Sequence, residues 1–345
     1  MDKIRLIDVY RRTNLYKCNR YHCIIDVKHS IWKENRNVAN PEISIVCPAY
    51  NEEEGIGLFL EKLIPVMEGL GRTYEIVFVN DGSRDHTLEV LRQEKKKYAH
   101  IRIINLSRNF GKEAALTAGL EYARGDAVVA IDTDLQHPPE VITEFVQKWE
   151  EGYDVVVGKR LSRTGEHPLK KLAARLFYTL HNKISDIEIP ADIGDFRLMS
   201  RKVVDALKLL PENQRFMKGV FAWVGFKTAV VEYYQEERAS GTSSFNGWKL
   251  WNFALDGITS FSTVPLRVWL YLGFVIATIS FVFGLWIAVK TIIFGVETPG
   301  YASTMVMILF LGGIQLMGIG ILGEYIGRLY KEAKRRPVYI VEGEY

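Results

Sequence analysis

Two carboxylates two residues apart, Asp132 and Asp134, have the spacing that most directly indicates chemistry. They stand in the sequence DTDLQ, directly after the apolar run Ala127–Ile131. Carboxylates brought together by a turn are oxygen ligands of the kind that hard divalent cations prefer. Such a cation can neutralise a diphosphate and help it leave. A solvated turn carries the same pattern, so the place of this turn in the fold must decide between the two interpretations.

Two more polar clusters follow apolar runs upstream. Asn51 and Glu52 come after the first run, and Asn80 and Asp81 come after the second. Strand-like runs alternate with helical stretches of roughly 10–15 residues, which argues for βαβ units and a parallel sheet covered on both faces. In such a sheet, ligands bind beyond the carboxyl ends of the strands. We therefore expect all three clusters on one rim, which favours a binding site at Asp132.

The α/β core is expected from about Pro41 to Gly158. Runs rich in Val and Ile predict its strands, and apolar residues at helical spacing predict its helices. The predicted strands are Ile43–Cys47, Tyr74–Val79, Ile101–Leu106, Ala127–Ile131 and Asp154–Val157, and the predicted helices are Ile56–Leu70, Thr87–Tyr98 and Ala114–Tyr122.

The C-terminal part differs in composition. Val268–Val289 is a run of 22 residues without a charge, and Ser303–Leu322 contains Gln315 as its only strongly polar residue. Each run can cross the ~30 Å hydrocarbon core of a bilayer, and two in tandem favour membrane spans over buried core helices. Basic residues border the outer ends of the pair, which puts the large N-terminal domain in the cytoplasm. They are Arg267, Arg328, Lys331, Lys334, Arg335 and Arg336.

Two further segments have the features of interfacial helices. Residues 169–184 carry apolar residues at helical spacing with basic residues between them, and residues 245–262 carry two tryptophans just before the first span. A basic amphipathic helix beside a membrane lies in the headgroup plane, where tryptophan is enriched. For residues 169–184, a helix packed on the sheet is an equal alternative.

Composition limits the function classes. The 345 residues are 48% apolar with a net charge of +3, which excludes a disordered chain and gives no support for nucleic-acid binding. Three cysteines without metal-ligand spacing indicate ordinary thiols in a reducing compartment. Residues 1–40 are polar, basic and aromatic with no continuous apolar stretch, so no signal peptide is expected, and we assign them no role.

The motifs PAYNEEE, VNDGSRDHT, NLSRNFGKEAALTAGL, DTDLQHPPE, GDFRLMSR and LGEYIGRLY occur in this order. With them the chain resembles inverting glycosyltransferases of family 2 with the GT-A fold. Within this family it resembles the polyprenyl-phosphate branch, which includes dolichyl-phosphate mannose synthases and bacterial undecaprenyl-phosphate glycosyltransferases. The stretches NFGKE, LHNKIS, FNGWKLWN and GITSFST resemble in particular the bactoprenol glucosyltransferases of phage and prophage O-antigen clusters.

The resemblance extends from about Pro41 to Pro337 and implies an α/β fold. A Rossmann-like, mostly parallel GT-A sheet would form the catalytic domain, followed by interfacial helices and two transmembrane helices. The domain boundaries expected from it are 1–40 for an N-terminal extension, 41–240 for the glycosyltransferase domain, 241–266 for the interfacial region, 267–323 for the two spans and 324–345 for a basic cytoplasmic tail.

On the donor side, the resemblance implies roles for residues of the first two polar clusters. Pro48, Tyr50 and Glu52 would border the nucleotide base, and Asp81 would hydrogen-bond it. Family members often have a second aspartate before Asp81. This chain has Asn80 there, so only the role of Asp81 carries over.

At the third cluster, the resemblance places Asp132 near the ribose and diphosphate. Asp134 and Gln136, together with Asp132, would ligate Mg²⁺ or Mn²⁺. His137 stands where many relatives have aspartate, and as a lone histidine it is interpreted as a turn residue. Arg160 aligns with an arginine that approaches the phosphates, although a strand-end surface charge is an equal alternative on the residues alone.

The remaining roles concern the acceptor and a closing loop. Asp195 and Arg197 in GDFRL resemble an acceptor-side catalytic motif, with Asp195 orienting the acceptor or acting as base; a local ion pair is the plain alternative. Arg238 and Ser243 resemble the loop that closes over the diphosphate. A lysine that often follows this serine is missing here, because Ser244-Phe245-Asn246 stands in its place.

The expected function is transfer of glucose from UDP-glucose to undecaprenyl phosphate with inversion, at the cytoplasmic face of the inner membrane. GDP-mannose, a UDP-N-acetylhexosamine or a UDP-aminoarabinose derivative remain alternative donors, and a non-catalytic membrane scaffold is the alternative from another class. The expected partners are the nucleotide-sugar, the lipid, the membrane and a small protein that flips the glycolipid. Glycines in the second span are compatible with a homo-oligomer.

Overall fold

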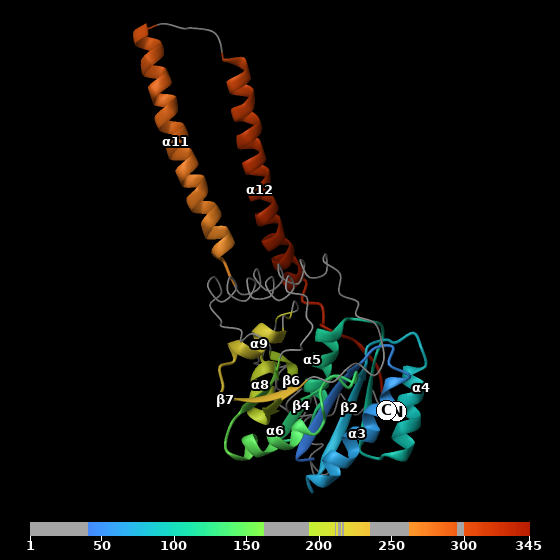
Figure 1. The fold of residues 1–345 in the computed structure, drawn as a ribbon. Helices are drawn as coiled ribbons and strands as arrows, with labels where there is room; N and C mark the ends of the chain where they lie inside the picture. Colours follow the sequence, from blue (N-terminus) through green and yellow to red (C-terminus); the bar gives the residue numbers. More distant parts are fainter. Residues whose placement is uncertain are drawn as a thin grey trace, which may run out of the picture.

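The computed structural model describes residues 41–161, 193–210, 212, 215, 217–234, 262–294 and 300–345. Its main body is a mixed sheet in the order β7-β5-β6-β4-β1-β2-β3-β8, below two long helices (Figure 1). The strands are β1 Ile43–Ala49, β2 Tyr74–Asn80, β3 Ile101–Leu106, β4 Ala127–Ala130, β5 Val155–Leu161, β6 Ile193–Ser200, β7 Thr228–Tyr234 and β8 Val341–Glu344.

The sheet is mostly parallel, as the sequence predicts. Strands β1 to β4 pair in parallel, and β7 pairs in parallel with β5. Strand β6 lies antiparallel between β4 and β5, and β8 lies antiparallel on the edge of β3. The central strands are buried along nearly their whole length, which explains why they read as continuous Val- and Ile-rich runs.

Helices cover both faces of the sheet. The apolar sides of α3 (Gly55–Gly69), α4 (Thr87–Lys97) and α6 (Val141–Glu150) join the hydrophobic core on one face. The other face is covered by α5 (Lys112–Tyr122), α8 (Arg201–Lys208) and α9 (Met217–Trp223). This three-layer arrangement leaves the carboxyl ends of the parallel strands as the open rim of the domain.

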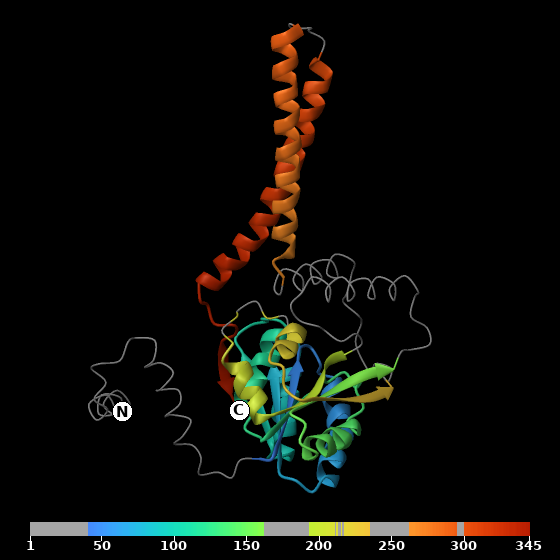
Figure 2. The same ribbon diagram turned by 90° about the vertical axis from the view of Figure 1, so that its left-hand side faces the viewer.

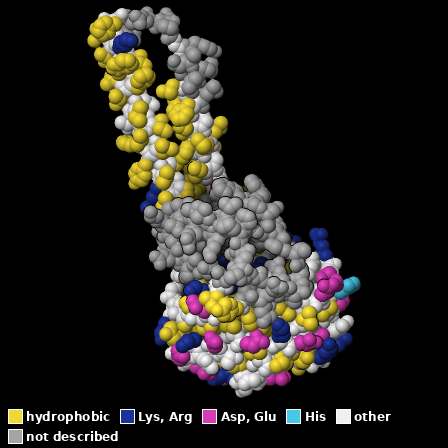
Figure 3. All heavy atoms as spheres, in the orientation of Figure 1, with side chains coloured by type: hydrophobic (Ala, Val, Ile, Leu, Met, Phe, Trp, Pro, Cys, Tyr) yellow, Lys and Arg dark blue, Asp and Glu magenta, His cyan; other side chains and the backbone are white. Residues whose placement is uncertain are grey.

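Two long helices rise from the domain and return as an antiparallel hairpin (Figures 1 and 2). They are α11, Val264–Phe294, and α12, Tyr301–Ala333. Both are long and apolar enough to cross a bilayer, with the second apolar segment at Phe310–Ala333. Their side chains are mostly apolar and exposed, whereas the charged side chains gather on the body below (Figure 3). Both predicted spans therefore lie in helices, and the exposed apolar surface supports membrane association.

The two long helices pack closely at a glycine. Gly318 of α12 lies so close to Trp269 of α11 that a Cβ atom added to the glycine would overlap the indole ring. Nearer the domain, the Tyr325 hydroxyl donates to the Ser262 carbonyl over 2.7 Å. Small residues of this kind let two helices approach closely where no water drives their association.

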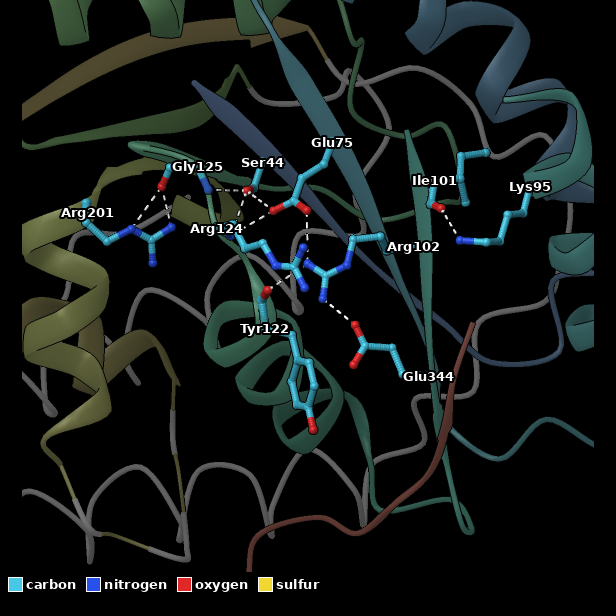
Figure 4. Close-up of polar contacts among 10 residues, drawn as sticks. All are labelled: Ser44, Glu75, Lys95, Ile101, Arg102, Tyr122, Arg124, Gly125, Arg201 and Glu344. Atoms are coloured by element: carbon cyan, nitrogen blue, oxygen red, sulfur yellow. Dashed lines mark hydrogen bonds and ion pairs between the residues drawn. The ribbon is translucent and has the colours of Figure 1, made fainter. Parts of the chain in front are cut away.

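A buried polar network stabilises the amino ends of the strands, opposite the rim (Figure 4). The Glu75 carboxylate accepts from the Ser44 hydroxyl at 2.6 Å, from the Arg124 backbone at 2.7 Å and from Arg102 at 2.9 Å. Arg102 also pairs with Glu344 of β8. Glu75 is 5% exposed, so its charge needs this full set of donors.

The last strand is a feature that sequence analysis missed. Residues 324–345 were expected to form a basic tail, whereas α12 continues to Ala333 and residues 341–344 join the sheet as β8. The chain returns to the α/β domain because the edge of β3 offers unpaired backbone groups. Residues 1–40, the proposed interfacial segment 169–184 and nearly all of 245–262 lie outside the described residues.

Candidate active site

The centre of the rim is a lysine held between two carboxylates. Lys112 Nζ lies 2.8 Å from Asp132 Oδ2 and 2.9 Å from Asp195 Oδ2. Asp132 follows β4, Asp195 lies near the start of β6, and Lys112 opens α5. Because β6 runs antiparallel to β4, its first residues reach the edge at which β4 ends. Two aspartates 63 positions apart in the sequence thus share one ammonium.

Electrostatics fix the charge state of this triad. Burial by itself raises the pKa of Asp132, but Lys112 and a contact with His137 outweigh it and hold this pKa well below its usual range. Burial likewise raises the pKa of Asp195, and Lys112 again lowers it below the ordinary value. Partial loss of hydration lowers the pKa of Lys112, but the two carboxylates outweigh this and raise it above the ordinary value. All three groups are therefore charged at neutral pH.

The turn after β4 has a strained backbone. Leu135 has φ of 57°, which bulky residues rarely adopt, and its side chain is 4% exposed in the core. Burying this side chain offsets a strain of about 1 kcal/mol. Asp134 Oδ1 accepts the Gln136 backbone N–H at 3.1 Å. The turn thus keeps Asp132 and Asp134 in a fixed arrangement at the rim.

His137 is part of the wall of the site. Its Nδ1 lies 2.6 Å from the Tyr233 hydroxyl, and its Nε2 lies 3.7 Å from Asp132 Oδ2. The ring stacks on Phe196 with centroids 5.1 Å apart. The sequence interpretation as a turn residue is therefore incomplete, because the imidazole connects β7 to the Asp132 carboxylate.

A second, buried layer of charge lies behind Asp195. Arg197 is 4% exposed; its Nη2 donates to the Gly194 carbonyl at 2.7 Å, and its guanidinium covers the Phe221 ring at 3.8 Å. Burial lowers the pKa of Arg197 to about 10, so it stays cationic at neutral pH. Burial and the nearby Asp195 raise the pKa of Glu113 to about 8. Among the described residues, the Arg197 Nε has no hydrogen-bond partner, which leaves a buried donor two residues from Asp195.

Asp81 anchors the loop that carries Lys112. Its two carboxylate oxygens accept the backbone N–H groups of Phe110 at 2.7 Å and Gly111 at 2.9 Å. The next residue, Gly82, also packs closely against this loop. Its φ is 61°, and a Cβ atom added there would overlap the backbone of Arg108. Asp81 is 3% exposed, so the structure gives it a loop-holding role in addition to the predicted contact with a base.

The first polar cluster forms the outer wall of the rim. The Asn51 backbone N–H donates to Ser83 Oγ at 3.0 Å, and the Glu52 backbone N–H donates to Thr87 Oγ1 at 2.9 Å. These contacts fasten the loop after β1 to the loop after β2. Tyr50 is 41% exposed beside them, as a side chain that borders a ligand would be.

The donor set at the rim fits a divalent cation that draws further oxygens from its substrate. Asp132, Asp134 and the Gln136 amide offer oxygen ligands on one turn, and Mg²⁺ typically takes one or two carboxylates together with phosphate oxygens. Within the part of the chain that the structure describes, no three His, Cys, Asp or Glu side chains converge as a metal-binding group.

The structure brings some of the predicted residues together and leaves others apart. Asp132 and Asp195 share Lys112, and Arg197 lies behind them. Arg160 is the register partner of Tyr233 at the end of β5, on the side of His137. Pro48 lies near the carboxyl end of β1, where it is the register partner of Val79, and Tyr50, Glu52 and Asp81 follow on the loops after β1 and β2. Arg238 and Ser243 lie outside the described residues.

Lys112 and Glu113 are the site residues that sequence reasoning missed. Both stand in NFGKE, one of the motifs that carries the family resemblance, but a lysine opening a helix has no spacing that assigns it to two aspartates elsewhere in the chain. The contact of Lys112 with Asp132 and Asp195 is visible only in the structure, where α5, β4 and β6 come together. A polar residue directly after a strand-end loop is the signal that could have identified it.

Comparisons with known proteins agree with the two-part architecture. Residues 44–208 match the family described as glycosyl transferase family 2, and residues 264–329 match the GtrB C-terminal hairpin. Over 303 residues the chain is 53% identical to a bactoprenol glucosyl transferase of Shigella phage SfV, covering 88% of this chain and 99% of that protein.

Two further relatives extend the likeness. A prophage bactoprenol glucosyl transferase homolog of Escherichia coli is 52% identical over 301 residues, covering 87% of this chain and 98% of that protein. An uncharacterised glycosyltransferase of Synechocystis is 54% identical over 300 residues, covering 87% of this chain and 94% of that protein.

Proposed function

Because the chain belongs to glycosyl transferase family 2, we propose that it transfers glucose from UDP-glucose to a polyprenyl phosphate with inversion. One observation carries this proposal: the likeness to a bactoprenol glucosyl transferase spans 99% of that protein, transferase domain and hairpin together. The expected family and enzyme class are thereby confirmed. The glucose donor, the undecaprenyl acceptor and the role of each site residue are the parts that we propose.

The triad Asp132–Lys112–Asp195 supports this reaction. A phosphate monoester is already largely ionised at neutral pH, so transfer needs alignment and charge neutralisation more than a strong base. Lys112 is a cation within 3 Å of both the donor-side and the acceptor-side carboxylate. We assign Lys112 to neutralising the two anionic substrates where they meet, and Asp195, whose pKa is lowered, to orienting the acceptor.

The donor would lie across the loops after β1, β2 and β4. Pro48, Tyr50, Glu52 and Asp81 would border the base, and Asp132 the ribose and diphosphate. Asp134, Gln136 and Asp132 would hold Mg²⁺ or Mn²⁺, which supplies positive charge to the leaving diphosphate. Arg160 would contribute further positive charge from the end of β5.

The helix hairpin would hold the site close to the lipid acceptor. A polyprenyl chain leaves the bilayer only at a large free-energy cost, so the enzyme must hold its site at the headgroup plane. The body that carries the rim lies below the two long helices (Figure 2). With basic residues at the domain-proximal ends of both helices, we place the catalytic domain at the cytoplasmic face of the inner membrane. A small flippase and a homo-oligomer remain proposed partners.

Sugar transfer by the purified full-length protein tests this function. Undecaprenyl phosphate is offered with radiolabelled UDP-glucose, UDP-GlcNAc or GDP-mannose, each with Mg²⁺, Mn²⁺ or EDTA. We expect lipid-linked label from UDP-glucose that EDTA abolishes. Label from another donor alone would overturn the glucose assignment and keep the reaction, whereas no label from any donor by folded protein would contradict the proposal.

A matched pair of variants separates chemistry from folding. Asp195→Asn should lower kcat/KM by roughly 100-fold or more, because it removes the carboxylate beside Lys112. Asp205→Asn makes the same change on α8, where the side chain is 59% exposed and, among the described residues, forms ion pairs with neighbours on its own helix at 3.8 to 3.9 Å. Equal losses in both variants would argue against the proposed role of Asp195.

A further inference from the structure

The strand that follows the membrane hairpin is connected to the loops of the donor side. Seven residues, 334–340, join the end of α12 to β8, and β8 pairs with the edge of β3. Two side chains of β8 face the sheet edge at alternate positions. Glu344 pairs with Arg102 at the amino end of β3 (Figure 4), and Glu342 accepts a hydrogen bond near its carboxyl end.

From Glu342 a continuous chain of hydrogen bonds crosses three strands. Asn105 Nδ2 donates to Glu342 Oε2 at 2.8 Å, and Asn80 Nδ2 donates to Asn105 Oδ1 at 2.7 Å. Ser83 then donates to Asn80 Oδ1, with its hydroxyl at 2.5 Å and its backbone N–H at 3.3 Å. The Asn51 backbone N–H donates to Ser83 Oγ at 3.0 Å. We call these five residues the Glu342 chain.

The direction of every bond in the Glu342 chain is determined at both ends. A backbone N–H can only donate, so the Asn80 atom that faces Ser83 must be oxygen and its amide nitrogen must face Asn105. A carboxylate can only accept, so Asn105 must turn its nitrogen to Glu342 and its oxygen to Asn80. The two arguments start at opposite ends and give the same orientation for both amides.

The middle of the Glu342 chain is buried. Asn80 is 2% exposed and Asn105 is 5% exposed, and the two are register partners in β2 and β3. Buried amides require partners, and aligned hydrogen bonds in such surroundings polarise one another. Without the Glu342 carboxylate, the Asn105 amide nitrogen loses the acceptor that it has in the described part of the chain, and a buried donor is left without a partner at this end of the Glu342 chain.

We propose that Glu342 and Asn105 are positioning residues for the donor-binding loops. Through Asn80 they set the place of Ser83, and through Ser83 the place of Asn51, so that the loops after β1 and β2 hold one geometry. This inference rests on the proposed function, in which those loops border the nucleotide. If the inference holds, the enzyme binds its donor tightly only when β8 is paired with the edge of β3.

Steady-state kinetics of the full-length protein test this inference, with UDP-glucose varied at saturating undecaprenyl phosphate. In Glu342→Leu we expect KM for the donor to rise roughly 3- to 10-fold, the equivalent of one hydrogen bond, with kcat within about twofold of wild type. Glu342→Gln keeps an acceptor oxygen and should restore the wild-type KM. Asn105→Asp places an acceptor against Glu342 and should raise KM at least as much.

The matched control is Glu344→Leu, the same substitution two residues further along β8. It removes the pairing with Arg102 but leaves the Glu342 chain intact, so KM should stay within about twofold of wild type. An equal rise in KM in both leucine variants overturns the inference, because the effect would then come from weaker pairing of β8 with β3. No rise in KM in Glu342→Leu overturns it as well.

Amide hydrogen exchange gives a readout that does not depend on turnover. In Glu342→Leu, peptides covering residues 50–53 and 80–87 should exchange faster than in wild type, and those of α6 should not. If wild type transfers no sugar, the proposed function fails while this measurement still decides the inference. Unchanged exchange in both loops would overturn it.

Discussion

Replacing Lys112 by methionine tests whether the shared ammonium sets the charge of the site. Lys112 Nζ lies 2.8 Å from Asp132 Oδ2 and 2.9 Å from Asp195 Oδ2, so these two oxygens lie no more than about 5.7 Å apart. At an effective dielectric constant of about 20, the ammonium attracts each carboxylate at these distances by about 6 kcal/mol, and this attraction is what Lys112→Met removes. Lys112 is 47% exposed, and screening by solvent reduces this to about 1 to 2 kcal/mol. Without the lysine, the pKa of one aspartate should therefore rise by about one unit.

The consequence is a shift in the acid limb of the pH–rate profile. In wild type, Lys112 holds the pKa of both Asp132 and Asp195 low, so both stay ionised as the pH falls. In Lys112→Met the first protonation occurs at higher pH. The acid limb of kcat/KM for sugar transfer should therefore move up by about one pH unit, with a fall in kcat at neutral pH from the lost cation.

Lys112→Arg is the control for this prediction. A guanidinium keeps the positive charge between the carboxylates, so this variant should keep the wild-type acid limb even if its altered shape lowers kcat. The reasoning would be refuted by a Lys112→Met profile that falls uniformly at every pH without a shift of the limb. It would be refuted equally by Lys112→Arg shifting the limb as far as Lys112→Met.

Three further substitutions test separate parts of the structure. Gly82→Ala combines a strained φ with overlap against the neighbouring loop backbone, so the free energy of unfolding of the protein should fall by about 2 kcal/mol or more in denaturant titration. Gly318→Val forces Trp269 away and should lower the melting temperature in detergent, whereas Gly320→Val, with open space around it, should not. Glu113 has a raised pKa of about 8, so its contribution to stability is fully present below its unfolded-state pKa and is lost as the pH rises through about 8. Glu113→Gln should therefore remove part of the decline in stability between pH 5 and 8, and an unchanged decline would contradict the raised pKa.

Much of the fold could be read from local pattern. Strand Ile101–Leu106 was predicted at its observed bounds, and the first two strands differ from β1 and β2 only at their carboxyl ends. Buried parallel strands must be apolar on both faces, so their sequences leave little alternative. The rim position of Asp132 followed as well, because parallel strands that alternate with helices present their carboxyl ends at one edge.

The sequence by itself therefore determined the layers, the two long apolar helices and the family, since each depends on residues close together in the chain. Tertiary structure alone decided which side chains meet. Lys112 reaches Asp195 because antiparallel β6 returns to the edge at which β4 ends. Arg102 pairs with Glu344, 242 residues away, because the chain after the hairpin finds an open strand edge. Contacts of this range carry no signature in local spacing, because backbone pairing and burial, not sequence separation, determine which groups become neighbours.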